Sequence, residues 1–121
     1  MSQTVAILGA SAKPERFAHR AMNALLAAGH RVLLVHPRGG EIAGMPVYAR
    51  LDDLAARIDT LTLYVAAAAL EKSLPALLRL HPGRVIFNPG TESAQAQAAL
   101  DAAGIPWQED CTLVMLRQGR F

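Results

Sequence analysis

The feature that most constrains this chain is the alternation of short apolar runs with longer helical stretches. The apolar runs are Val5–Leu8, Val32–Val35, Leu61–Val65 and Val85–Phe87. Each is apolar on both faces, which is typical of strands in a parallel sheet that has helices on both sides. The alternation therefore predicts an α/β fold with a doubly wound, mostly parallel sheet.

The stretches between these runs carry helical patterns. The clearest helix is predicted over residues 15–28, where apolar residues recur every three or four positions and Gly29 follows as a terminator. Further helices are predicted over residues 51–57, 71–80 and 92–103. The second of these should not begin much before Glu71, because Pro75 is tolerated only near a helix start. Residues 106–108 and 112–116 are candidate strands, and a buried helical turn would give 112–116 the same pattern. The expected architecture is Rossmann-like.

Length and charge narrow the class of protein further. The 121 residues predict one domain, 1–121, with no room for a second catalytic domain. A net charge of +2 without a run of Lys or Arg indicates neither a nucleic acid nor a membrane surface as partner. No apolar stretch approaches the roughly 20 residues of a membrane span. With Cys111 as the only cysteine and no targeting segment, we expect a cytoplasmic protein. A homo-oligomer is compatible with the sequence.

Three loops are the expected place of function. In a doubly wound sheet, ligands bind beyond the carboxyl ends of the strands, near the point where the strand order reverses. The loops that leave these ends cover residues 9–16, 36–44 and 66–71.

The first loop predicts a phosphate site. Gly9 follows a strand directly, so the backbone can turn tightly and an anion can approach the peptide N–H groups. Ser11 adds a hydroxyl donor, and Lys13 and Arg16 add positive charge. Pro14 is expected in the first turn of the following helix, whose dipole favours an anion. The expected occupant is a pyrophosphate.

The second and third loops bear on which nucleotide is bound. Enzymes that use NAD usually have an acidic residue about 20 residues beyond the glycine loop, for the ribose hydroxyls. This chain has His36, Pro37 and Arg38 there, and a guanidinium binds phosphate oxygens in bidentate fashion. Arg38 therefore favours a ribose with an extra phosphate, as in NADP or coenzyme A. In the third loop, Ala66–Ala69 leave space for a base or an acyl chain, although close packing at a helix start would also explain them.

Taken together, the chain resembles the CoA-binding domain family, small proteins similar to the N-terminal domain of the succinyl-CoA synthetase α-subunit. The segments that carry the resemblance are "VAILGASAKPERFAHR", "GHRVLLVHPRGGEIAGMPVY", "LTLYVAAAALEKS", "VIFNPGTES" and "AGIPWQEDCTLVMLRQGRF". The resemblance implies contacts to the phosphates of CoA by Gly9, Ala10, Ser11 and Lys13. It implies a site after the second strand at Pro37 and Arg38, and an adenine bordered by Val65, Ala66 and Ala67.

The expected function is a stand-alone module that binds CoA or an acyl-CoA. The synthetase has its phosphorylated histidine in a second domain, and this chain shows no nucleophile motif, no P-loop lysine and no metal-ligand spacing. We therefore expect no enzymatic activity, no catalytic residue and no metal. Two alternatives stay open: a fragment of an NADP-type reductase, and a regulatory or structural subunit with an empty Rossmann-like site. Cys111 is expected to be a buried or half-buried structural thiol.

Overall fold

The computed structural model describes residues 2–121, which form a sheet covered by helices on both faces. The strands are β1 (Thr4–Leu8), β2 (Arg31–Val35), β3 (Glu41–Ile42), β4 (Met45–Tyr48), β5 (Thr60–Leu63), β6 (Arg84–Phe87) and β7 (Trp107–Glu109). Their order across the sheet is β3-β4-β2-β1-β5-β6-β7. All neighbours pair in parallel except β3 and β4. The predicted mostly parallel sheet is confirmed.

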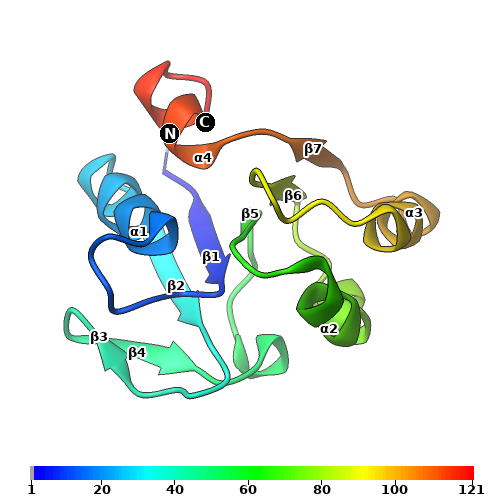
Figure 1. Ribbon diagram of the computed structural model, residues 1–121, viewed down its shortest axis with the longest axis horizontal. Helices are drawn as coiled ribbons and strands as arrows, with labels where there is room; N and C mark the ends of the chain where they lie inside the picture. The colour runs from blue at the N-terminus through cyan, green and yellow to red at the C-terminus, as the bar shows by residue number, and fades with distance from the viewer. Residues whose placement is uncertain (1) are drawn as a thin grey trace.

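The helices lie in two layers. They are α1 (Phe17–Ala27), α2 (Ala67–Leu80), α3 (Ala94–Ala103) and α4 (Thr112–Arg117), with a 3₁₀ turn, η1, at Leu51–Asp53. Helices α1 and α4 cover one face of the sheet, and α2 and α3 cover the other (Figure 1). This arrangement confirms the doubly wound, Rossmann-like fold. Among residues 2–121, no helix is both long and apolar enough to cross a membrane.

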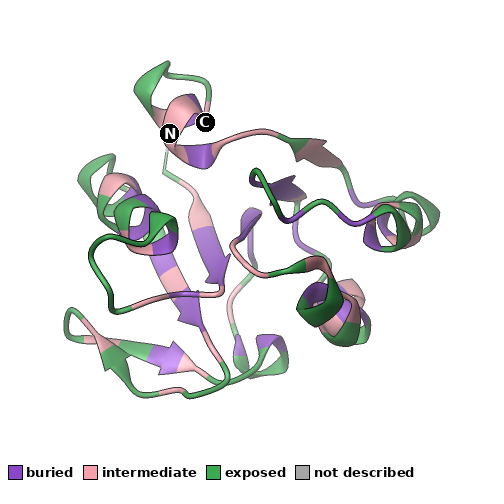
Figure 2. Cartoon of the chain, viewed as in Figure 1, coloured by how far each residue is buried: buried purple, intermediate pink, exposed green. Residues whose placement is uncertain are grey.

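The sheet divides the core into two clusters. Because successive side chains of a strand point to opposite faces, β1 contributes Ala6 and Leu8 to the cluster beneath α2 and α3. Val5 and Ile7 of the same strand pack beneath α1. Figure 2 shows the resulting buried residues along the central strands, between helices that are exposed on their outer sides. Burial on both faces is the reason why the buried positions of these strands are mostly apolar, with Thr60 and Thr62 of β5 as the polar exceptions.

Helix α2 begins earlier than predicted and contains Pro75 in its interior. The prediction that this helix would start close to Glu71 was wrong. Leu70, Leu74 and Leu77 are all buried and share one face of the helix, so α2 presents a continuous apolar stripe to the sheet. Packing of that stripe outweighs the hydrogen bond that the proline cannot donate.

Two other segments also differ from the prediction. Residues 51–57 form only the three-residue turn η1, because the chain becomes extended at Leu54 on its way to β5. Residues 112–116 lie in α4 and not in a strand, with Thr112 and Met115 buried. The β3–β4 hairpin was not anticipated.

Candidate functional site

The strand order reverses between β1 and β5. From β1 the chain passes through α1 to β2 on one side, and from β5 it passes through α2 to β6 on the other. The loops that follow β1 and β5 therefore leave adjacent strand ends in opposite directions (Figure 1). In folds of this type the crevice between two such loops is the usual ligand site. The first and third predicted loops meet here, and the second follows β2, the neighbour of β1.

Gly9 sets how closely the ends of β1 and β5 approach. Its φ is +96°, and a Cβ at this position would overlap the Tyr64 carbonyl oxygen and stand 2.9 Å from Val65 Cγ1. Any other residue would push the two strand ends apart. The glycine is therefore required by the backbone of β5 as well as by the turn itself.

The peptide donors of the first loop are divided between the sheet and solvent. The N–H groups of Gly9 and Ala10 both donate to the Val35 carbonyl at the end of β2, at 3.0 and 3.1 Å. The N–H groups of Ser11 and Ala12 donate to no acceptor within residues 2–121. The first N–H groups available to an anion are therefore those of Ser11 and Ala12. Gly9 and Ala10 instead hold the loop against the end of β2.

Helix α1 begins later than predicted, after a separate turn. Arg16 N–H donates to the Lys13 carbonyl at 3.1 Å, which closes a turn with Pro14 at its second position. The prediction of Pro14 in the first helical turn was therefore wrong, because proline also suits the second position of a β-turn. No side chain caps α1 at Arg16, and its first turn has no acidic residue. The positive end of this helix dipole therefore faces the loop.

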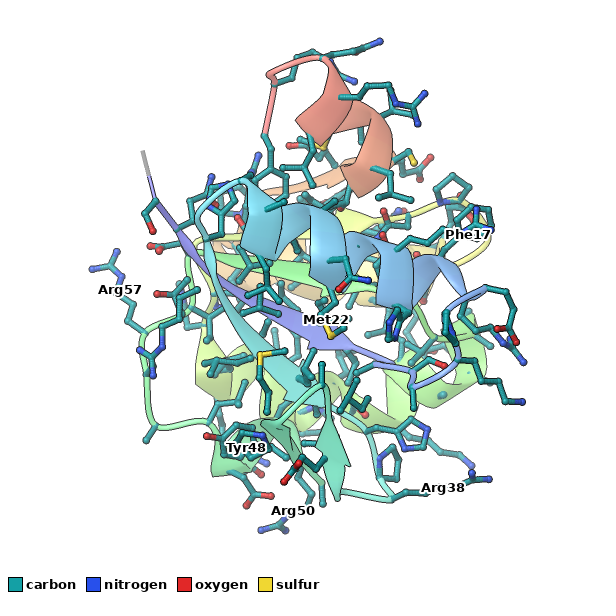
Figure 3. All side chains as sticks on the ribbon, turned by 90° about the vertical axis from the view of Figure 1, so that its left-hand side faces the viewer. Phe17, Met22, Arg38, Tyr48, Arg50 and Arg57 are labelled. Atoms are coloured by element: carbon teal, nitrogen blue, oxygen red, sulfur yellow. The ribbon has the colours of Figure 1, made fainter. Side chains whose placement is uncertain are left out.

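The second loop presents Arg38 to solvent. His36 accepts the Arg38 N–H at its Nδ1 atom, at 3.1 Å, and Gly39 N–H donates to the His36 carbonyl at 2.9 Å. Pro37 and Arg38 are both exposed in the resulting turn. Figure 3 shows Arg38 at the same end of the molecule as Phe17, the first residue of α1. His36 is bonded to backbone, and Arg38 is free to meet a ligand.

The cations around this edge are not neutralised by the protein. Lys13, Arg16 and Arg38 are exposed, and none of them forms an ion pair with the residues described. The arginines that do form ion pairs are Arg50, Arg79 and Arg120. The strand ends therefore carry positive charge that is available to an anion.

The third loop opens α2. Val65 is half-buried, and Ala66 is the N-cap residue of the helix, with no side-chain capping hydrogen bond. Ala67, Ala68 and Ala69 lie in the first turn of α2, which corresponds to the helix-start alternative for these alanines.

A buried polar network, which no pattern in the sequence predicted, lies beneath the loops. Asn88 Nδ2 donates to Thr62 Oγ1 at 2.7 Å and to the Leu63 carbonyl at 2.8 Å. Its Oδ1 atom accepts the Thr112 N–H at 2.9 Å, and the two threonine hydroxyls lie 2.9 Å apart. The signal available in the sequence was an asparagine, Asn88, directly after the apolar run Val85–Phe87. The network ties the ends of β5 and β6 to the start of α4.

Two further polar side chains, Tyr64 and Cys111, border this network. The Tyr64 hydroxyl is buried without a hydrogen-bond partner among the described residues. Burial raises the pKa of Tyr64 to about 12, because the ionised phenolate would lose its hydration. The neighbouring hydroxyls of Thr62 and Thr112 lower this pKa by a smaller amount. Cys111 carries a free thiol and is half-buried at the N-cap of α4, as predicted.

Comparison with known proteins decides the family. Residues 3–117 match the family model described as CoA binding domain. The chain belongs to the CoA-binding domain family. This membership confirms the resemblance that the motifs indicated.

Solved structures agree with this assignment. A crystal structure described as that of an uncharacterized protein is 34% identical, with a TM-score of 0.93 over 100% of this chain and 99% of that chain. A Thermus thermophilus protein is 37% identical, with a TM-score of 0.90 over 98% of this chain and 90% of that chain. The dinucleotide-forming acetyl-coenzyme A synthetase 1 of Ca. Korarchaeum cryptofilum is 15% identical, with a TM-score of 0.74 over 87% of this chain and 25% of that chain. The last similarity concerns the fold alone.

Proposed function

We propose that this CoA-binding domain protein binds coenzyme A or an acyl-CoA as a stand-alone module, at the carboxyl ends of β1, β2 and β5. The observation that carries the proposal is the juxtaposition of unpaired donors and cations at the strand-order reversal. Ser11 and Ala12 offer free N–H groups, and Lys13, Arg16 and Arg38 offer positive charge without ion-pair partners. Family membership selects CoA among the anions that such a site would attract.

The chemistry of CoA suits this order of groups. Its pyrophosphate would lie on the Ser11 and Ala12 N–H groups, with Lys13 and Arg16 beside it. Its 3′-phosphate would meet Arg38, which replaces the carboxylate of an NAD site. The adenine would lie beside Val65, Ala66 and Ala67, where the side chains are small. Pro37 holds the turn that presents Arg38.

We assign the isolated chain no catalytic step. Both histidines at this edge are bonded to backbone, His19 to the Ser11 carbonyl and His36 to the Arg38 N–H. Asn88 is fully engaged in the network with Thr62 and Thr112. These two histidines and Asn88 thus have structural partners, and we propose that chemistry on the ligand belongs to another protein.

Native mass spectrometry and titration calorimetry test the proposed function. The purified protein is expected to bind CoA more tightly than NADP, and NADP more tightly than NAD. Tighter binding of NADP than of CoA would support the reductase alternative, and the absence of binding to all three would support an empty structural site. Incubation with acetyl-CoA should release no thiol above the uncatalysed rate, and sustained release would overturn the assignment as a binding module.

A further inference from the structure

We infer that His19 is a positioning residue that orients the Ser11–Ala12 peptide so that the Ala12 N–H faces the pyrophosphate; this inference rests on the proposed function. His19 is half-buried in the first turn of α1, and its Nδ1 atom lies 2.8 Å from the Ser11 carbonyl oxygen, eight residues earlier. A carbonyl oxygen can only accept a hydrogen bond, so Nδ1 carries the proton. The imidazole is therefore a donor from the helix to the loop.

Because the peptide between Ser11 and Ala12 is planar, the hydrogen bond from His19 to the Ser11 carbonyl also fixes the direction of the Ala12 N–H. In a trans peptide, the N–H points opposite to the carbonyl of the preceding residue. When His19 holds the Ser11 carbonyl toward α1, the Ala12 N–H must point away from the helix. Ala12 is exposed, and its N–H has no acceptor in the part of the chain that is described. The donor is thus directed to the outside of the loop, where an anion would approach.

Nothing else in the loop holds this peptide. The first two N–H groups of the loop are fixed on the Val35 carbonyl, and the end of the loop is closed by Arg16 on the Lys13 carbonyl. Ser11 Oγ accepts the Lys13 N–H at 3.1 Å, which restrains the following peptide. Within residues 2–121, the bond from His19 is the one hydrogen bond to the peptide between Ser11 and Ala12. Without it, the peptide could turn its carbonyl oxygen toward the phosphates and repel them.

Two substitutions test whether the Nδ1 donor of His19, and not the rest of its side chain, is required for binding. His19→Asn keeps a donor, because the amide Nδ2 of asparagine lies at the same distance along the side chain as Nδ1 of histidine. His19→Ala removes it. We expect His19→Ala to raise the dissociation constants of CoA and of dephospho-CoA about 10- to 150-fold, the effect of one hydrogen bond to a charged group. His19→Asn should stay within about threefold of the unaltered protein.

A ligand without pyrophosphate and a distant histidine provide the controls. Adenosine 3′-monophosphate, titrated by NMR, should bind both His19 variants as it binds the unaltered protein. His81 is exposed and ends α2 at the other end of the molecule, so His81→Ala should leave the affinity for CoA unchanged. Circular dichroism would verify that each variant is folded.

The amide resonance of Ala12 reports the orientation directly. On addition of CoA it should shift strongly in the unaltered protein and in His19→Asn, and only weakly in His19→Ala. The inference is overturned if His19→Ala binds CoA normally, if His19→Asn loses as much affinity as His19→Ala, or if the Ala12 resonance never responds. Failure of the unaltered protein to bind CoA at all would instead overturn the proposed function, and this inference would fall with it.

Discussion

Gly9 combines a positive φ with a close approach to the neighbouring strand. Its left-handed conformation turns the chain after β1, and its missing side chain lets the backbone of β5 approach at Tyr64. Gly29 shares the positive φ, at +86°, but a Cβ there would have no neighbour within 4 Å. An alanine at Gly29 would therefore suffer only the strain of the positive φ, whereas an alanine at Gly9 would suffer that strain and a steric overlap with β5.

Gly9→Ala is expected to lower the free energy of unfolding by roughly 2–5 kcal/mol, as the sum of left-handed strain and overpacking against β5. Gly29→Ala should lower it by only about 1–2 kcal/mol, because strain alone applies there. Urea denaturation of both variants measures the difference. Equal losses would show that β5 does not limit the position of residue 9.

His30 makes stability depend on pH. Its Nδ1 atom accepts the Gln3 N–H at 3.0 Å, and burial, together with the charge of Arg84, lowers the pKa of His30 below its ordinary value of 6.5. Because the unfolded chain then binds the proton more readily, the free energy of unfolding should be constant above neutral pH and fall as the pH drops below about 6.5. Denaturation curves between pH 5 and 8 would show this for the unaltered protein. His30→Asn, which does not titrate, should show a weaker fall, and an unchanged profile would assign the dependence to another group.

At the scale of elements, α2 shows how packing overrides a local signal. Pro75 is exposed and stands in the interior of a helix of 14 residues. Its opposite face is the buried stripe that contains Leu74 and Leu77, which secures the helix against the sheet. The helix therefore tolerates the hydrogen bond that Pro75 cannot donate, because its buried leucines pack against the sheet.

Pro75→Ala should raise the free energy of unfolding by about 2 kcal/mol. Alanine is favoured over proline in a helix interior by about 3 kcal/mol, and about 1 kcal/mol is returned because the unfolded chain becomes more flexible. Thermal unfolding followed by circular dichroism would measure the gain, with Ala76→Gly as a change of opposite sign in the same helix. A destabilised Pro75→Ala would mean that the helix depends on a bend that the proline provides.

At the scale of the whole molecule, the proposed site depends on three strand ends that meet at one edge of the sheet. Arg38 follows β2, the loop with Ser11 follows β1, and Ala66 follows β5. Figure 3 places Arg38 at this edge and Arg57 at the opposite end of the molecule. Arg57 is likewise exposed and forms no ion pair with the described residues, so it is a matched control for charge.

Arg38→Ala should weaken the binding of CoA about 10- to 150-fold, the value of one hydrogen-bonded charged contact. Dephospho-CoA, which lacks the 3′-phosphate, should be little affected, and the difference isolates the single contact. Arg57→Ala should change neither affinity. Calorimetric titration of both ligands provides the test; an equal loss for CoA and dephospho-CoA would show that Arg38 acts only as a general attractor of anions.

The sequence by itself determined the central strands, the helix α1 and the location of the three loops. These follow from local patterns: β1, β2, β5 and β6 are buried on both faces, and α1 has a clear helical period with Gly29 at its end. The family followed from the order of the motifs, since no single motif is specific. The position of Arg38 at the end of β2 needed only the boundary of that strand.

Only the tertiary structure decided which loop donors are free. The Gly9 and Ala10 N–H groups are occupied because β2 places the Val35 carbonyl beside them, and this register is a long-range property. The same holds for α4, where Thr112 bonds to Asn88, 24 residues away, and for α2, where the sheet compensates for Pro75. A local pattern reports which conformation a segment favours. Which groups remain unpaired depends on neighbours that are distant in the chain, and the proposed site rests on those unpaired groups.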